Sequence, residues 1–280
     1  NLGSSDVFMQ ASVLELFDPD RSKTVTFRGE IHGYSDFVTA MRDMFAVQKV
    51  KAGAGLRILT GNVSSPTLGA QLEAVLAELP LARWHQWEAV ANRDAERAAS
   101  LAVFGRDVAP LFRFEKADVV VSLDADFLGS GANHIRHARD FGARRTPAIG
   151  EGHGHETAGA HALNRLYVFE SMPSSTGSVA DHRWRVRSSD VAAVGQALAG
   201  ALGVAGVTSV GLPEGVAPAQ IAALAADLRS HKGRAVVIAG DAQPAYVHAL
   251  AHLINDALGA AGNVVYYIEP PSVRSEDHGQ

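Results

Sequence analysis

Three acidic side chains follow two runs of β-forming residues in this 280-residue chain. Asp124 and Asp126 come directly after the run Asp118–Leu123, and Glu170 follows the run Leu166–Phe169. Carboxylates two residues apart can act as an acid–base pair or bind a hard metal ion. Carboxylates in such loops also accept hydrogen bonds from backbone N–H groups and cap helices. Both interpretations stay open, and we favour the structural one.

Two groups of histidines invite a metal interpretation. His134 and His137 are spaced i, i+3 on a predicted helix and so share one face. Two ligands are fewer than the three or four protein ligands that zinc uses, so we expect this face to be solvated or to lie at an interface. His153, His155 and His161 lie in a glycine-rich stretch that offers no partner to orient the imidazoles, and we expect no functional metal site there.

Other familiar chemistries are excluded or weakly supported. The chain has no cysteine, which excludes disulfides, a thiolate-held iron–sulfur cluster and a cysteine nucleophile within these residues. No G-x-S-x-G elbow is present, so a serine hydrolase is disfavoured. The stretch GNVSSPTLG, with Ser65 as predicted N-cap and Pro66 opening a helix, is either an ordinary strand–helix turn or an anion contact.

Composition is that of an ordinary α/β protein, with 47% hydrophobic and 20% charged residues. A net charge of −5 disfavours a nucleic-acid partner, because phosphate binding requires clustered Lys and Arg. No apolar run reaches the roughly 20 residues that span a bilayer, so we expect no direct membrane span, and any membrane association to be peripheral or through a partner. The absence of an initiator Met and the tail after the last predicted strand lead us to expect a segment of a longer protein.

Apolar periodicity predicts strands that alternate with helices. The predicted strands are 24–27, 56–60, 82–87, 118–123, 165–169, 235–239 and 264–268. The predicted helices are 35–50 (with Ser35 as N-cap), one that begins at Pro66, 95–104, 133–141, 190–202, 217–229 and 244–258. This order predicts an α/β fold: a doubly wound, mostly parallel sheet with helices on both faces. We expect an N-terminal extension over 1–55, a Rossmann-like domain over 56–205 and a smaller α/β unit over 206–280.

The strand ends at 123 and 169 both open into loops of small residues, which is typical of a ligand crevice in such a sheet. The stretches KADVVVSLDADFLGSG and VFESMPSSTGSVADHRWRVRSSD resemble the corresponding loops of the molybdopterin oxidoreductase family. The resemblance covers residues 115–205 well and 56–80 and 235–268 more loosely.

In that family these loops hold the guanine dinucleotide tails of a molybdenum cofactor. The resemblance therefore implies that Ser122 and Asp124 face a dinucleotide. It also implies that Glu170 stands for a strand-end Asp and Asp190 for the guanine-contacting Asp. Asp124, Ala125 and Asp126 replace the family's Gly-x-Asn, which adds negative charge where a phosphate would lie. We expect Ser122, Asp124, Asp126, Glu170 and Asp190 to line a vestigial pocket, with no catalytic residue and no metal ligand.

Longer phrases, among them QASVLELFDPDRS, SPTLGAQL, HARDF and TGSVADHR, resemble a narrower family. This is the iron–sulfur subunit of alternative complex III, a quinol:electron-acceptor oxidoreductase. The resemblance implies a cofactor-free molybdopterin-oxidoreductase-like domain, with iron–sulfur clusters C-terminal to this segment. It also implies a location on the periplasmic face of the bacterial inner membrane, and a multi-haem cytochrome and a quinol-binding membrane subunit as partners.

Two alternatives from other classes stay open. The first is a fragment of an oxidoreductase that binds molybdenum through molybdopterin guanine dinucleotide, which Asp190 and TGSVADHR favour and the Asp124–Asp126 loop opposes. The second is a module that binds a nucleotide or another small ligand without any redox role.

Overall fold

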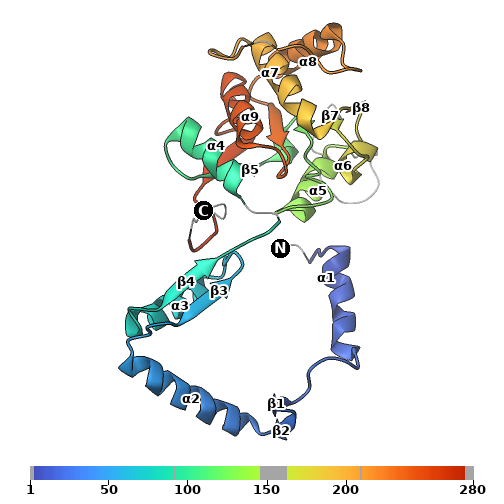
Figure 1. Cartoon of the computed structure of the whole chain (residues 1–280). Helices are drawn as coiled ribbons and strands as arrows, with labels where there is room; N and C mark the ends of the chain where they lie inside the picture. The colour runs from blue at the N-terminus through green and yellow to red at the C-terminus, as the bar shows by residue number, and fades with distance from the viewer. Residues whose placement is uncertain (1–2, 91–92, 146–162, 209, 275–280) are drawn as a thin grey trace. The chain divides into compact units, whose positions relative to one another are not determined.

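The computed structural model describes residues 3–90, 93–145, 163–208 and 210–274. By contacts, the chain divides into two compact units (Figure 1). The first comprises residues up to Ala89 together with the segment that begins at Pro271, and the second comprises Val90–Pro270. Within the described parts of the chain, none of the helices combines the length and the apolarity needed to cross a bilayer.

The first unit is largely open to solvent. Its only sizeable apolar cluster among the described residues gathers Val63, Leu72 and Trp84, with Val273 packed against it. Its elements are α1 (Val7–Ala11), the 3-10 helix η1 (Ser12–Phe17), the antiparallel pair β1 (Val25–Phe27) and β2 (Glu30–His32), α2 (Tyr34–Val50), the parallel pair β3 (Arg57–Thr60) and β4 (Arg83–Gln86), and α3 (Pro66–Glu78).

The helix starts of this unit test two predicted caps. Ser65 caps α3 as expected, and its hydroxyl accepts a hydrogen bond from the Leu68 N–H at 3.3 Å. The prediction that Ser35 caps α2 is wrong, because the N-cap is Gly33. The Asp36 carboxylate accepts a hydrogen bond from the Gly33 N–H at 3.2 Å and so fixes the helix start there.

The second unit is built around a four-stranded parallel sheet with the order β8-β7-β6-β9. The strands are β6 (Val119–Leu123), β7 (Arg165–Glu170), β8 (His182–Arg185) and β9 (Ala235–Ala239). The other elements are α4 (Asp94–Phe104), β5 (Ala109–Phe112), η2 (Phe114–Lys116), α5 (His134–Ala143), α6 (Ser175–Ser178), η3 (Ser188–Asp190), α7 (Val191–Leu202), α8 (Pro218–Ser230), α9 (Ala245–Ala257) and β10 (Val265–Ile268).

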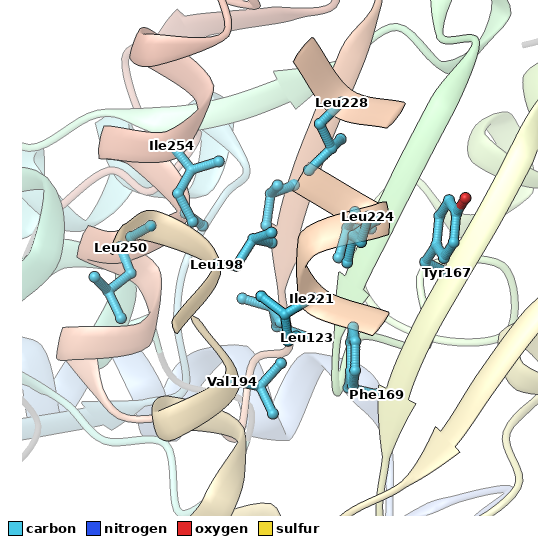
Figure 2. Close-up of a cluster of buried hydrophobic side chains, with 14 of the residues drawn as sticks. Leu123, Tyr167, Phe169, Val194, Leu198, Ile221, Leu224, Leu228, Leu250 and Ile254 are labelled. Atoms are coloured by element: carbon cyan, nitrogen blue, oxygen red, sulfur yellow. The ribbon is translucent and has the colours of Figure 1, made fainter. Parts of the chain in front are cut away.

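Apolar side chains on both faces of this sheet are buried, as expected for parallel strands. Figure 2 shows one face, where side chains of β6 and β7 pack against α7, α8 and α9. The labelled members are Leu123, Tyr167, Phe169, Val194, Leu198, Ile221, Leu224, Leu228, Leu250 and Ile254. On the opposite face Val120 and Val168 pack with Phe141 of α5 and with Phe114. Helices therefore cover both faces, and the predicted α/β class and doubly wound sheet are confirmed.

The strand order contains one reversal. The chain steps from β6 to β7 to β8 in one direction and later places β9 on the other side of β6. The carboxyl ends of β6 and β9 therefore meet at the topological switch point, the usual place for a crevice in such sheets. The segments on either side of residue 205 share this sheet, since β9 pairs with β6 residue by residue.

Some elements differ from expectation. β5 and β8 were not predicted, and β10 pairs antiparallel with β5 instead of joining the parallel sheet. The predicted irregular segment that contains His153, His155 and His161 lies outside the described residues.

A candidate site at the switch point

Asp124 is the first residue after β6 and lies at the topological switch point. One oxygen of its carboxylate accepts hydrogen bonds from the Ser188 hydroxyl (2.9 Å) and from the Gln243 side-chain amide (2.7 Å). The other oxygen accepts a longer hydrogen bond, 3.4 Å, from the Ser171 N–H. The Gln243 amide also donates to the Ser188 hydroxyl at 2.8 Å. We call these four residues the Asp124 latch, because one carboxylate holds together four chain segments that are far apart in sequence.

Gln243 is the most buried member of the latch, with 1% of its surface exposed. Its amide nitrogen makes both hydrogen bonds just described, to Asp124 and Ser188. Its amide oxygen is buried and has no hydrogen-bond partner among the described residues. An unpaired buried acceptor is unfavourable by about 1–3 kcal/mol, so this oxygen marks a position where a hydrogen-bond donor would be stabilised.

The two strand ends approach each other closely beside the latch. The Gly240 N–H donates to the Leu123 carbonyl at 2.9 Å, which continues the β6–β9 ladder past the last paired residues. A Cβ on Gly240 would lie 2.0 Å from the carbonyl oxygen of Asp124, so only glycine fits there. Asp124 itself has φ = 61°, in the left-handed region that favours glycine and that aspartate tolerates better than most residues.

Asp126 has a structural role, as favoured from sequence. Its carboxylate accepts hydrogen bonds from both the N–H and the hydroxyl of Thr176, each at 2.8 Å. The buried Thr176 hydroxyl accepts in turn from the Leu128 N–H at 3.1 Å. Asp126 therefore joins the loop after β6 to α6 and does not pair with Asp124 across an open site.

Ser122 is fully buried and is used within its own loop. Its hydroxyl donates to the Ala125 carbonyl and accepts from the Ala125 N–H, both at 2.9 Å. It holds the turn that follows β6, and its single donor hydrogen is not available to a dinucleotide phosphate.

Glu170 is the last residue of β7 and is 3% exposed, and its carboxylate has hydrogen-bond donors from neighbouring residues. Its carboxylate accepts hydrogen bonds from the N–H (3.3 Å) and hydroxyl (2.5 Å) of Ser174 and forms an ion pair with Arg183 of β8. Gly177 packs directly against it, because a Cβ there would lie 1.8 Å from a carboxylate oxygen of Glu170. The strand-end carboxylate is thus enclosed by its neighbours.

Asp190 lies at the start of α7 without capping it through its side chain. Its carboxylate accepts a hydrogen bond from the Ser189 hydroxyl at 3.1 Å. The structure therefore brings Asp124 together with Ser188 and Gln243, which sequence reasoning did not select, and keeps Asp190 out of the latch. Gln243 lies in the loop after β9. If the pairing of β9 with β6 had been known, this loop would have been placed beside Asp124, and Gln243 would have become a candidate.

The prediction that the face of His134 and His137 is solvated or lies at an interface is wrong for His137. This ring is buried, and its centroid lies 4.9 Å from that of Phe114 and 6.2 Å from that of Phe112. Burial lowers the pKa of His137 to about 4, so the imidazole is neutral at physiological pH. Among the described residues no group of three or more His, Asp or Glu side chains is placed to hold a metal ion.

The loop before α3, in the first unit, also has an internal anion. The Asn62 N–H donates to the Glu88 carboxylate at 2.9 Å, and a Cβ on Gly61 would lie 2.5 Å from the same carboxylate. One backbone donor of the turn that could have bound an anion, the Asn62 N–H, is therefore already bonded to the Glu88 carboxylate.

No family model matches this sequence, and no curated protein does. A solved structure, "Acetylene Hydratase from Pelobacter acetylenicus", superposes on 87% of the chain with a TM-score of 0.54 and 14% sequence identity. The chain therefore shares its fold with this protein. It covers 35% of the length of the acetylene hydratase chain, and at this identity the likeness concerns the fold alone.

The resemblance to the molybdopterin family raises the question whether a dinucleotide fits. Donors at the strand ends are taken by Asp124, Asp126 and Glu170. The resemblance would place a phosphate at the loop that carries Asp124 and Asp126. Two unit charges about 4 Å apart near a protein surface interact by about 4 kcal/mol, which is repulsive for a carboxylate beside a phosphate. The residues present therefore do not fit a molybdopterin guanine dinucleotide.

Proposed function

We propose that this chain is a cofactor-free, molybdopterin-oxidoreductase-like domain that serves as a scaffold in an electron-transfer assembly. The observation that carries the proposal is the Asp124 latch. Its carboxylate uses the hydroxyl, amide and N–H donors that a bound anion would need at the switch point. A crevice whose donors are satisfied from within is suited to stability and not to turnover of a ligand.

The assembly we propose is alternative complex III, a membrane-associated quinol:electron-acceptor oxidoreductase. Support comes from the long sequence phrases that resemble its iron–sulfur subunit, and from a fold of the molybdopterin oxidoreductase type. With no cysteine in these residues, the clusters of such a subunit would be held elsewhere. In this proposal the domain works at the periplasmic face of the inner membrane, beside a multi-haem cytochrome and a quinol-binding membrane subunit.

Exposed apolar side chains in the first unit support a scaffold role. Phe8 in α1 and Phe17 in η1 are 79% and 78% exposed, and Val50 at the end of α2 is 90% exposed. Contiguous exposed apolar surface marks sites that contact other proteins, and α1 and η1, which carry Phe8 and Phe17, contact each other. The acidic neighbours Asp6 and Asp18 disfavour an anionic lipid surface as the contact.

The scaffold role is tested by purifying the assembly from native membranes through a tag on this chain. We expect the material purified through the tag to show haem absorbance and quinol-oxidation activity. Both should be lost in a variant that carries Phe8→Ser and Phe17→Ser. Leu59→Thr, at a 72% exposed position in β3, is the matched control and should retain both. A tagged chain that elutes alone, without haem or quinol oxidation, would contradict the proposal.

A further inference from the structure

Two histidines of α9 lie on the face of this helix that meets α4. The two helices pack side by side (Figure 1). His248 and His252 are four residues apart in α9 and so share one face of it, and they are 6% and 5% exposed. Phe104, the last residue of α4, lies against His252, with the ring centroids 5.2 Å apart. A contact between two helices therefore contains two buried groups that can acquire a charge.

Neither imidazole has a partner for a second N–H group. The Nε2 atoms of His248 and His252 are buried and have no hydrogen-bond partner among the described residues. Nδ1 of His252 lies 3.2 Å from the hydroxyl oxygen of Tyr267. Protonation gives an imidazole two N–H donors, so each buried Nε2–H would stay unpaired while its ring carries a charge. A buried charge without a partner is strongly unfavourable, and both histidines would gain hydration if the two helices separated.

The groups around the two histidines do not compensate for this burial. Asp241, in the loop before α9, favours the charged form of His248, but burial outweighs it and lowers the pKa of His248. Burial, and to a smaller extent the neighbouring His248, lowers the pKa of His252 to about 4. Helix α7, which also packs on α9, has no titratable side chain, and neither has β9.

The other charged or titratable groups near the contact come from α4 and β10. Burial raises the pKa of Tyr267, so this phenol is neutral in acid and at physiological pH. Arg97 of α4 forms an ion pair with Asp107 at 3.7 Å. Burial raises the pKa of Glu96, although Arg93 donates a hydrogen bond to it at 2.9 Å. A raised carboxyl pKa favours the folded state in acid, so Glu96 opposes the effect of the two histidines and must be kept unchanged in a test.

We propose that the contact between α4 and α9 is acid-sensitive: protonation of His248 and His252 releases α4 from α9 while the parallel sheet stays folded. In the opened form water stabilises the charged imidazoles, so opening becomes more favourable as the pH falls below about 6.5. Because α4 is the first element after the division of the chain at Ala89, its release would lengthen the segment between the two units. The inference is independent of the proposed scaffold role, since it concerns contacts within the second unit alone.

A single introduced thiol can report the opening, because the chain has no cysteine. Ala99 of α4 is 1% exposed, so the thiol of Ala99→Cys should react only when α4 leaves its place. Ala225→Cys in α8, also at a 1% exposed position, is the matched control for unfolding of the sheet. Both variants are labelled with dithiodipyridine, which reacts with thiols in acid as well. Each labelling rate is divided by that of the urea-unfolded variant at the same pH.

Between pH 7.5 and pH 5 the normalised labelling rate of Ala99→Cys should rise about 30-fold or more. This factor follows from His252 alone, whose pKa of about 4 would return to about 6.5 in the opened form. The rate of Ala225→Cys should rise much less. In the Ala99→Cys chain, His252→Phe should reduce the rise, and adding His248→Gln should reduce it further.

Three results would overturn the inference. They are an equal rise at the two thiols, no rise at Ala99→Cys, and a rise that His252→Phe and His248→Gln leave unchanged. If a variant does not fold at pH 7.5, hydrogen exchange of the unsubstituted chain decides the question. After correction for the intrinsic exchange rate, the amides of α4 should lose protection at pH 5 while those of β6 keep theirs. Parallel behaviour of α4 and β6 would contradict the proposal.

Discussion

The side-chain amide of Asn255 in α9 makes both hydrogen bonds of a strand partner with Val237 in β9. Its nitrogen donates to the Val237 carbonyl and its oxygen accepts from the Val237 N–H, each at 2.8 Å. In the described sheet β9 is an edge strand: it pairs with β6 on one side and with no strand on the other. A helix side chain therefore satisfies backbone groups of a buried strand edge that no further strand covers.

Asn255→Leu is expected to lower the free energy of unfolding by about 3 kcal/mol, because it leaves a buried N–H and a buried C=O without partners. Urea denaturation followed by circular dichroism measures the change. Asn263→Ala is the matched control, since it removes one exposed hydrogen bond to the Gly259 carbonyl and should change stability by less than about 0.5 kcal/mol. Equal effects of the two substitutions would show that the Asn255–Val237 pair contributes nothing specific.

Gly177→Ala tests the enclosure of Glu170. The added methyl group would overlap the carboxylate, so we expect a loss of about 1–3 kcal/mol. Gly200→Ala in α7 has no heavy atom within 4 Å of the new Cβ outside its own helix and should be neutral or stabilising by up to about 1 kcal/mol. A Gly177→Ala variant as stable as Gly200→Ala would mean that Glu170 is not held in the position described.

The Glu170–Arg183 ion pair is tested by a double-mutant cycle. Arg183→Gln leaves a 3% exposed carboxylate without its counter-charge, so it should destabilise more than Glu170→Gln does. The side chain of Arg183 is 29% exposed, which places the expected loss near the lower end of the range for buried pairs, about 3 kcal/mol. If the two side chains are coupled, the double variant should lose less unfolding free energy than the sum of the losses of the two single variants.

Two buried histidines give the stability a pH dependence of known sign. Burial lowers the pKa of both His137 and His252 to about 4, below the ordinary value near 6.5 that the unfolded chain keeps. Between these values the unfolded chain binds more protons, so stability is full above about pH 6.5 and falls as the pH drops toward 4. Each histidine contributes a slope of up to about 1.4 kcal/mol per pH unit.

His137→Phe removes one titrating group and should therefore reduce that slope; the new ring would lie among the rings of Phe112, Phe114 and Phe127. Urea denaturation at pH 7.5 and pH 5 measures the difference. His85→Phe, at an exposed position, is the control and should leave the slope unchanged. An unaltered slope in His137→Phe would show that this imidazole is not neutral in the folded chain.

The central strands were predictable because their runs of Val, Leu and Phe are buried on both faces and bounded by turn residues. β8 was missed because its sequence, His-Arg-Trp-Arg, is that of a charged edge strand, and β5 because Pro110 interrupts a short run. His137 was misjudged because the aromatic rings that bury it come from other segments of the chain. The Asp124 latch could not be predicted for the same reason. Gln243 and Asp124 are 119 residues apart in sequence, and only the order of the strands brings them together.

The central claim, that this domain holds no molybdenum cofactor, is tested most directly by elemental analysis and pterin fluorescence of the assembly purified from native membranes. The measurement uses the protein in its native assembly, so that a cofactor bound there is retained. We predict iron without molybdenum and without pterin. Molybdenum in equimolar amount with this chain, together with pterin fluorescence, would contradict the account and favour the enzyme interpretation of Asp190.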